Sequence, residues 1–125
     1  MARSQQRSKR KISGGRYRSS RGKRKFELGG FPAMTKLAVR QAKKIRVIGG
    51  NVKQKLLATN MVQVSDATGK TQKAEILNVV ENTANPNLVR RNVMTQGCVV
   101  DTKLGKVRIT SRPGQEGTLQ GMILK

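Results

Sequence analysis

The chain has 125 residues, enough for one small domain and not for two. It contains 27 lysines and arginines against 6 acidic residues and no histidine, so its net charge is +21. A charge of this size predicts a polyanionic partner: a nucleic acid, an anionic membrane or an acidic protein. The membrane is the least favoured partner, because the sequence has no apolar run of about 18 residues and its basic N-terminal segment has neither a secretory signal nor a hydrophobic face.

The residues needed for catalysis or metal binding are scarce. There is one cysteine, which excludes an internal disulfide, and without histidine a transition-metal site would need several of the scattered carboxylates together. Cys98 precedes Val99 and Val100, a context typical of a small core residue rather than a reactive thiol. No phosphate-binding loop or paired carboxylate motif is present. We therefore expect no enzyme activity, no metal, no cofactor and no small-molecule substrate, and a cytoplasmic location.

The positive charge is concentrated in the first half of the chain. Residues 1–55 hold 18 basic residues and one acid, whereas residues 56–125 hold nine basic residues and five acids. Residues 1–25 contain eleven cations, no acid and only four apolar residues. Such a segment cannot bury enough surface to offset the entropy of ordering it. The sequence thus predicts a basic arm, residues 1–25, that is disordered when free, followed by a compact domain, residues 26–125.

The first predicted structure in the domain is a β-hairpin. Residues 33–44 contain good helix formers, but their apolar positions form no clean stripe, so a helix is the less favoured interpretation. Two apolar runs, 45–48 and 52–58, flank Gly49-Gly50-Asn51, which is a strong turn signal. Pairing of these runs requires a positive φ at Gly49 or Gly50.

The rest of the domain reads as short strands separated by turns. Residues 66–69 form a turn that ends in glycine, residues 82–87 a loop, and residues 111–117 a Pro/Gly loop. Alternation of apolar and polar residues, as in 106–110, has the period of two of a half-buried strand. The predicted fold class is mainly β: a small antiparallel β-barrel-like domain, or a sandwich, with an extended basic N-terminal arm. The expected later strands are residues 61–64, 74–80, 99–102, 106–110 and 118–124.

Basic residues in the arm, around the Gly-Gly turn and in two loops are the candidates for nucleic-acid contact. Arginine binds phosphate in a bidentate manner, lysine supplies a point charge, and an aromatic ring can stack on an unpaired base. A Gly-Gly turn also lets backbone amides approach phosphates. Solvated charges and an ordinary hairpin turn are the alternatives, and for the loop arginines they are as well supported. The candidate nucleic-acid-binding residues are Arg3, Arg7, Lys9, Arg10, Lys11, Arg16, Tyr17, Arg18, Arg21, Lys23, Arg24, Lys25, Lys43, Lys44, Arg46, Gly49, Gly50, Asn51, Lys53, Lys55, Arg90, Arg91 and Arg112.

Several segments together resemble one known family. They are Ser13-Gly14-Gly15, residues 22–29 (GKRKFELG), Gly49-Gly50-Asn51, residues 78–82 (NVVEN), Val89-Arg90-Arg91 and residues 111–115 (SRPGQ). In this order they resemble the small-subunit ribosomal protein "eight" of the archaeal and eukaryotic type. The resemblance implies a β-barrel-like domain and a basic arm, both bound to small-subunit ribosomal RNA. Eukaryotic members carry a basic insertion near residues 102–106, where this chain has a short turn typical of archaeal members.

One position departs from the family pattern. Ile48 stands where the family's arginine is expected before Gly49-Gly50-Asn51, which removes one expected phosphate contact. The predicted function is a structural constituent of the small ribosomal subunit that binds and stabilises ribosomal RNA beside neighbouring ribosomal proteins. Two alternatives remain: a chromatin protein that binds duplex DNA, and an RNA-modifying enzyme or its accessory subunit.

Overall fold

A computed structural model describes residues 3–124 of the chain. The chain divides into two compact units, Met1–Pro32 and Ala33–Lys125. The first unit contains the whole of the predicted arm and extends to Pro32. All strands of the described residues lie in the second unit, in the order β1 (Thr35–Lys36), β2 (Gln41–Arg46), β3 (Val52–Ala58), β4 (Met61–Ser65), β5 (Thr71–Glu81), β6 (Val93–Met94), β7 (Val99–Thr102), β8 (Gly105–Ile109) and β9 (Gln120–Ile123).

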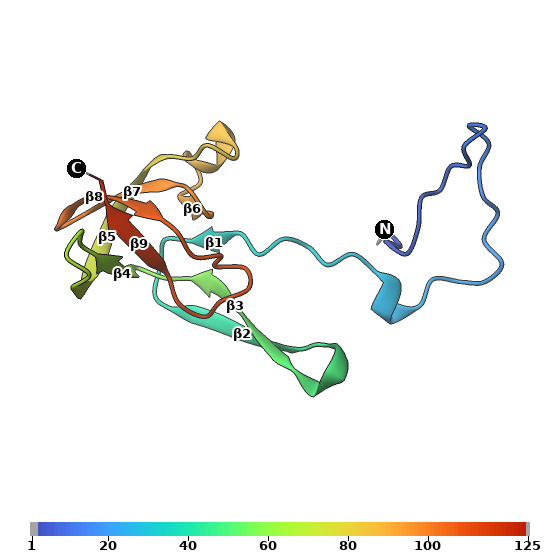
Figure 1. The fold of residues 1–125 in the computed structure, drawn as a ribbon, viewed down its shortest axis with the longest axis horizontal. Helices are drawn as coiled ribbons and strands as arrows, with labels where there is room; N and C mark the ends of the chain where they lie inside the picture. The colour runs from blue at the N-terminus through green and yellow to red at the C-terminus, as the bar shows by residue number, and fades with distance from the viewer. Residues whose placement is uncertain (1–2, 125) are drawn as a thin grey trace. The chain divides into compact units, whose positions relative to one another are not determined.

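Five strands of the second unit form a closed barrel in the order β4-β5-β7-β8-β9 (Figure 1). Four neighbouring pairs are antiparallel, namely β4–β5, β5–β7, β7–β8 and β8–β9, and the closing pair β4–β9 is parallel. The parallel pair aligns Val64 with Gly121 and leaves the barrel without a free edge. The predicted β-barrel-like fold is confirmed, although one closing pair is parallel rather than antiparallel.

Short β-branched side chains fill the barrel. Val62, Val64, Val100, Val107 and Ile109 are at most 1% exposed, as the alternating pattern predicts. Small residues suit a five-stranded barrel, because its interior is narrow.

The lone cysteine belongs to the same core. Cys98 is fully buried, and burial raises the pKa of its thiol because desolvation disfavours the thiolate. The expectation that Cys98 is a core residue is confirmed.

A second sheet, in the order β2-β3-β1-β6, lies beside the barrel in the same unit. Strand β1 pairs parallel with β3 and antiparallel with β6, and the Thr35 hydroxyl donates to the Leu56 carbonyl at 2.6 Å. The helix considered for residues 33–44 does not form. This segment contains β1 and most of β2, because its buried contacts come from distant strands that override a modest helical propensity.

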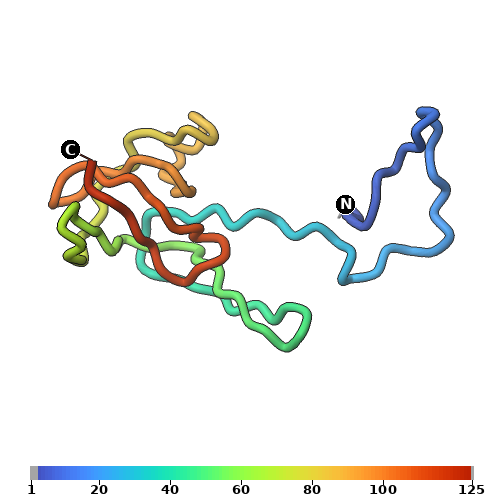
Figure 2. Tube along the Cα trace, in the orientation of Figure 1, coloured from blue at the N-terminus to red at the C-terminus, as the bar shows by residue number. Residues whose placement is uncertain are grey.

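Strands β2 and β3 form the predicted hairpin, which projects away from the barrel (Figures 1 and 2). Their turn, η2 (Ile48–Gly50), lies at the far end of the projection. Two further short 3₁₀ segments are η1 (Lys25–Glu27) in the first unit and η3 (Pro86–Leu88) in the loop after β5.

The first unit runs out and back as a loop (Figure 2). An isolated bridge joins Ser4 to Leu28 near its two ends, and another joins Arg10 to Arg16 near its tip. Residues 5–26 are all solvent exposed. Polar contacts and not a core therefore define this unit.

Candidate nucleic-acid interface

The β2–β3 hairpin displays cations on both of its faces. Lys43 lies opposite Lys55, Lys44 opposite Gln54, and Ile45 opposite Lys53. Directly opposite residues of an antiparallel pair project from the same face. Lys43, Lys53 and Lys55 therefore share one face, whereas Lys44 and Arg46 share the other. The hairpin offers positive charge to a polyanion from either side.

The turn of this hairpin has the backbone that the sequence predicts. Gly49 and Gly50 have φ values of 80° and 77°, and the Val47 N–H donates to the Asn51 carbonyl at 2.9 Å. A Cβ added at Gly50 would meet no atom within 4 Å. Backbone conformation, rather than a lack of space, thus requires glycine there, and the end of the hairpin is sterically open.

A loop from the other end of the chain packs on the base of the hairpin. The Leu56 N–H donates to the Pro113 carbonyl at 2.8 Å, which places the 111–117 loop beside β3. In that loop, the Arg112 Nε donates to the Gln96 side-chain oxygen at 3.1 Å. The fold thus brings the Arg112 loop and the hairpin together, although they are distant in sequence.

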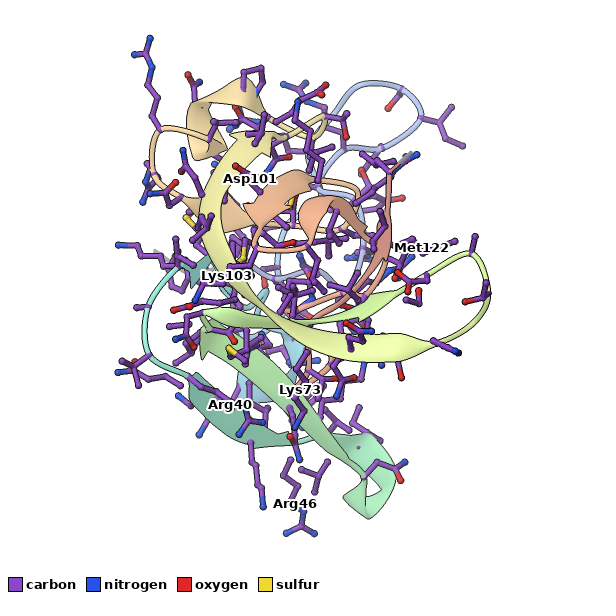
Figure 3. All side chains as sticks on the ribbon, turned by 90° about the vertical axis from the view of Figure 1, so that its left-hand side faces the viewer. Arg40, Arg46, Lys73, Asp101, Lys103 and Met122 are labelled. Atoms are coloured by element: carbon purple, nitrogen blue, oxygen red, sulfur yellow. The ribbon has the colours of Figure 1, made fainter. Side chains whose placement is uncertain are left out.

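Arg40 is a basic residue of this surface that is absent from the predicted set. Its Nη2 donates to the Gly117 carbonyl at 3.1 Å, and its side chain remains exposed beside the start of β2. Figure 3 shows Arg40 and Arg46 along the same hairpin. The only sequence signal was its place in the basic stretch 36–55, because the contact that orients it depends on the fold.

Arg90 and Arg91 follow η3 in a tight turn. Asn85 caps η3 by accepting from the Asn87 N–H at 2.9 Å, and Asn92 ends the turn with a φ of 49°. Both arginine side chains are exposed. The Asn92 carbonyl accepts from the Leu37 N–H at 3.1 Å, so this turn borders the β1–β2 connection and not the hairpin turn.

In the first unit, cations surround the single tyrosine. The Arg7 guanidinium lies 4.4 Å from the centre of the Tyr17 ring, and the Lys11 ammonium lies 5.8 Å from it. The Arg10 Nη1 donates to the Gly14 carbonyl at 3.0 Å and so holds the tip of the loop. Tyr17 retains 44% exposure, which leaves part of its ring open to a base.

The remaining arm candidates are exposed along the loop. Arg21 forms an ion pair with Glu27, the only acid among the first 65 residues. Contact of any arm residue with RNA stays a prediction. The other exposed cations are Arg3, Lys9, Arg16, Arg18, Lys23, Arg24 and Lys25.

Four of the five acidic residues of the second unit lie outside the hairpin and its neighbouring 111–117 loop, and Glu116 lies in that loop. No acid occurs in the sequence between residues 33 and 65, which includes the whole hairpin. Asp101 on β7 and Glu75 on β5 belong to the barrel, where Glu75 pairs with Lys103 at 2.6 Å. Figure 3 shows Arg46 on the hairpin and Asp101 on the opposite side of the barrel. The hairpin is therefore more strongly positive than the barrel, where basic and acidic residues are mixed.

Among residues 3–124, no group of three or more His, Cys, Asp or Glu side chains is arranged to hold a metal ion. Within that same range, no helix has the length and hydropathy needed to cross a membrane. The fold and its charge distribution define a small, strongly basic β-barrel protein with an exposed cationic hairpin and a cationic N-terminal loop.

Comparison with known proteins identifies the family. Residues 4–124 match the family described as ribosomal protein S8e. The chain belongs to this family, which confirms the resemblance seen in the sequence. Members of this family are structural and non-enzymatic, as the missing catalytic residues predicted.

The similar proteins are archaeal and match over nearly their full lengths. Small ribosomal subunit protein eS8 of Methanocorpusculum labreanum is 50% identical over 122 residues, covering 97% of this chain and 98% of that protein. The eS8 protein of Methanobrevibacter smithii is 50% identical over 125 residues, covering 99% and 100%. That of Nanoarchaeum equitans is 47% identical over 122 residues, covering 97% and 96%.

Proposed function

We propose that the chain is a structural constituent of the small ribosomal subunit, located on cytoplasmic ribosomes, and that it binds and stabilises ribosomal RNA. The arm, residues 1–25, and the β2–β3 hairpin with its neighbouring loops are the proposed contacts. The observation that carries this proposal is the separation of charge: 18 of the 27 basic residues lie within residues 1–55, which contain one acid. Similarity to small ribosomal subunit proteins over nearly the full chain supports the assignment to this subunit.

The two basic parts suit different features of folded RNA. The hairpin is a narrow two-stranded ribbon with cations on both faces, so it can lie between two phosphate backbones and reduce their repulsion. The arm is longer and has no buried core, so it can follow an irregular RNA surface, and Tyr17 can stack on an unpaired base. Binding then stabilises the RNA without chemical turnover.

We further propose that residues 1–25 become ordered only on RNA. Their hydrogen bonds, such as that from the Tyr17 N–H to the Lys9 carbonyl, are solvent exposed. Such bonds break in local opening motions, and the freed groups then bind water. Repulsion among eleven cations opposes a closed loop until phosphates neutralise it. Amide hydrogen exchange of the free protein should show no protection in 1–25, and strong protection there without RNA would contradict this.

Sedimentation of a cell extract tests the function directly. The protein should travel with small ribosomal subunits through a sucrose gradient and remain with them after the two subunits separate. Recovery only with chromosomal DNA would favour the chromatin alternative.

A binding assay with purified protein separates the same alternatives in vitro. At fixed salt, small-subunit ribosomal RNA should bind more tightly than duplex DNA of equal phosphate content, because the arm and hairpin fit a folded RNA surface. Equal affinity would favour the chromatin protein. Cleavage or modification of RNA by the purified chain would favour the enzyme alternative.

A further inference from the structure

Glu27 stands alone as a negative charge in the most basic part of the chain. No other acid occurs before Asp66, whereas residues 1–32 contain eleven cations. Its side chain is nevertheless only 6% exposed, in a unit without an apolar core. Nearby polar groups must account for this shielding.

The contacts of Glu27 join segments that are far apart along the arm. Its carboxylate accepts hydrogen bonds from the Arg21 guanidinium and from the Ser4 hydroxyl, the latter at 3.5 Å. Its backbone carbonyl accepts from the Gln5 N–H at 2.9 Å. The residue therefore connects the beginning of the arm, the stretch before η1, and η1 itself.

Backbone hydrogen bonds next to Glu27 also join the two ends of the arm. Ser4 and Leu28 form an antiparallel bridge, and the Gly29 N–H donates to the Arg3 carbonyl at 2.9 Å. Together with Glu27, these contacts close residues 3–29 into one loop. Ten cations lie between the two ends of this bridge, from Arg7 to Lys25.

Arg21 favours the charged form of the Glu27 carboxylate. The hydrogen bond from Arg21 and the charge of Arg21 lower the pKa of Glu27 below its usual value of 4.5, and loss of hydration only partly opposes them. These contacts stabilise the closed loop only while Glu27 is charged. Because they lower its pKa, this stabilisation is fully present above the usual carboxyl pKa and is lost as the pH falls through the lowered pKa. The carboxylate is therefore charged at neutral pH and can pair with Arg21 when the arm closes.

We propose that Glu27 is a positioning residue for RNA binding: its carboxylate closes the arm into a loop that presents its cations to the RNA as one surface. The inference rests on the proposed function, since it concerns how the arm binds. In the RNA-bound arm, the Glu27 contacts offset part of the conformational entropy that is lost when the arm becomes ordered, so they raise affinity without a new contact to RNA. Closure forms as phosphates neutralise the repelling cations.

Loop closure by Glu27 and net charge alone predict opposite changes in RNA affinity when Glu27 is replaced. Replacing Glu27 with glutamine raises the net charge from +21 to +22, which by charge alone strengthens RNA binding. If Glu27 closes the arm, the same substitution weakens binding, since a neutral amide forms a weaker bond to Arg21. The sign of the change in dissociation constant separates the two explanations.

The experiment measures RNA affinity of the full-length chain at several salt concentrations. Glu27→Gln should weaken binding to small-subunit ribosomal RNA about three- to tenfold. Glu81→Gln is the matched control, because Glu81 is exposed on β5 and its loss changes the charge equally. This control should bind as tightly as wild type or slightly more tightly. The exchange Arg21→Glu with Glu27→Arg keeps the net charge and should recover affinity relative to Glu27→Arg alone.

Each result has one meaning. Equal or tighter binding by Glu27→Gln, as for Glu81→Gln, would overturn the role of Glu27 and leave the proposed function intact. Failure of the wild-type chain to bind the RNA would reject the proposed function itself. Weaker binding together with a lower denaturation midpoint would make Glu27 a general stabilising residue and would also overturn the inference. Weaker binding at an unchanged midpoint, with recovery by the exchange, supports it.

Discussion

In the unit Met1–Pro32 polar contacts hold the backbone together, whereas in the barrel apolar contacts do so. The first unit depends on the Arg21–Glu27 pair, on Tyr17 and its cations, and on a few exposed backbone hydrogen bonds. The barrel depends on buried side chains such as Val62, Val100 and Val107. Salt and phosphate should therefore alter the first unit strongly and the barrel weakly, because screening acts on exposed charges.

The residues that stabilise the fold and the residues proposed to bind RNA lie in different parts of the chain. The core side chains lie between Leu56 and Leu119, and the densest charge lies before residue 56. Changes in the core should alter unfolding, and changes in the arm should alter RNA affinity. Changes in the hairpin should alter both properties, because the hairpin is part of the folded second unit and also carries several of the proposed RNA-binding cations.

Deletion of residues 1–25 gives the largest expected effect on binding. The change removes eleven cations, so RNA affinity should fall about 100-fold or more near physiological salt, with a shallower log–log salt dependence. The denaturation midpoint should stay at the wild-type value, because none of the core side chains is removed. An unchanged salt slope would show that the arm is not the main phosphate contact.

Gly121→Ala should have the largest effect on stability and little effect on binding. A Cβ at position 121 would lie 2.5 Å from the Val107 Cγ1 and 2.8 Å from the Arg108 carbonyl oxygen, inside the barrel. Overpacking of this kind costs about 1–3 kcal/mol in free energy of unfolding. Chemical denaturation measures the loss, with Gly22→Ala as control because a Cβ there meets nothing within 4 Å. Wild-type stability of Gly121→Ala would mean that the barrel can expand there.

The parts of the fold with a local signal could be predicted from the sequence. The Gly-Gly turn, the turn at 66–69 and most of the strands around them follow from glycine placement and alternation. The first hairpin strand was expected at 45–48 but spans Gln41–Arg46, because Ile48 belongs to the turn η2. The two-residue strands β1 and β6 were missed, because two residues carry no periodicity. Their pairing depends on strands distant in sequence, which a local pattern does not encode.

Strand β5 shows a second limit of pattern reasoning. Its register with β7 shifts twice, between Ile76 and Asn78 and between Val79 and Glu81. Each bulge places two successive residues outward, so Leu77 and Val80 are about half exposed although the pattern reads as a buried run. The candidate site has the same limit: its cations could be listed from the sequence, but the approach of Arg40 and Arg112 to the hairpin could not.

Substitution of either turn glycine tests the hairpin, which should affect both stability and RNA binding, unlike the barrel or the arm. Valine at Gly49 or Gly50 must adopt a positive φ, which should destabilise the hairpin by about 1 kcal/mol or more. RNA affinity should fall further than that loss explains, because the turn also holds Arg46 and Lys53 in place. Paired measurements of denaturation midpoint and RNA dissociation constant at fixed salt check both expectations.

The control for the turn is an exposed cation at a different hairpin. Lys103→Ala removes an exposed pair with Glu75 and should change little. Wild-type stability and affinity in both glycine variants would show that the 48–51 turn is an ordinary surface loop.

Substitution of Ile48 should change RNA affinity less than the other changes, but it tests directly whether the end of the hairpin lies near a phosphate. Its side chain is 90% exposed at the end of the hairpin, where the resemblance to the family leads us to expect arginine. Ile48→Arg should supply one phosphate contact and steepen the log–log salt slope by about 0.7–0.9, with a several-fold gain in affinity. Ile48→Gln removes the same apolar surface without adding charge, so it should leave the slope at the wild-type value. Equal slopes for the arginine and glutamine variants would mean that the end of the hairpin does not approach a phosphate. The hairpin's share of the proposed contacts would then be limited to residues nearer its base, such as Lys43 and Lys55.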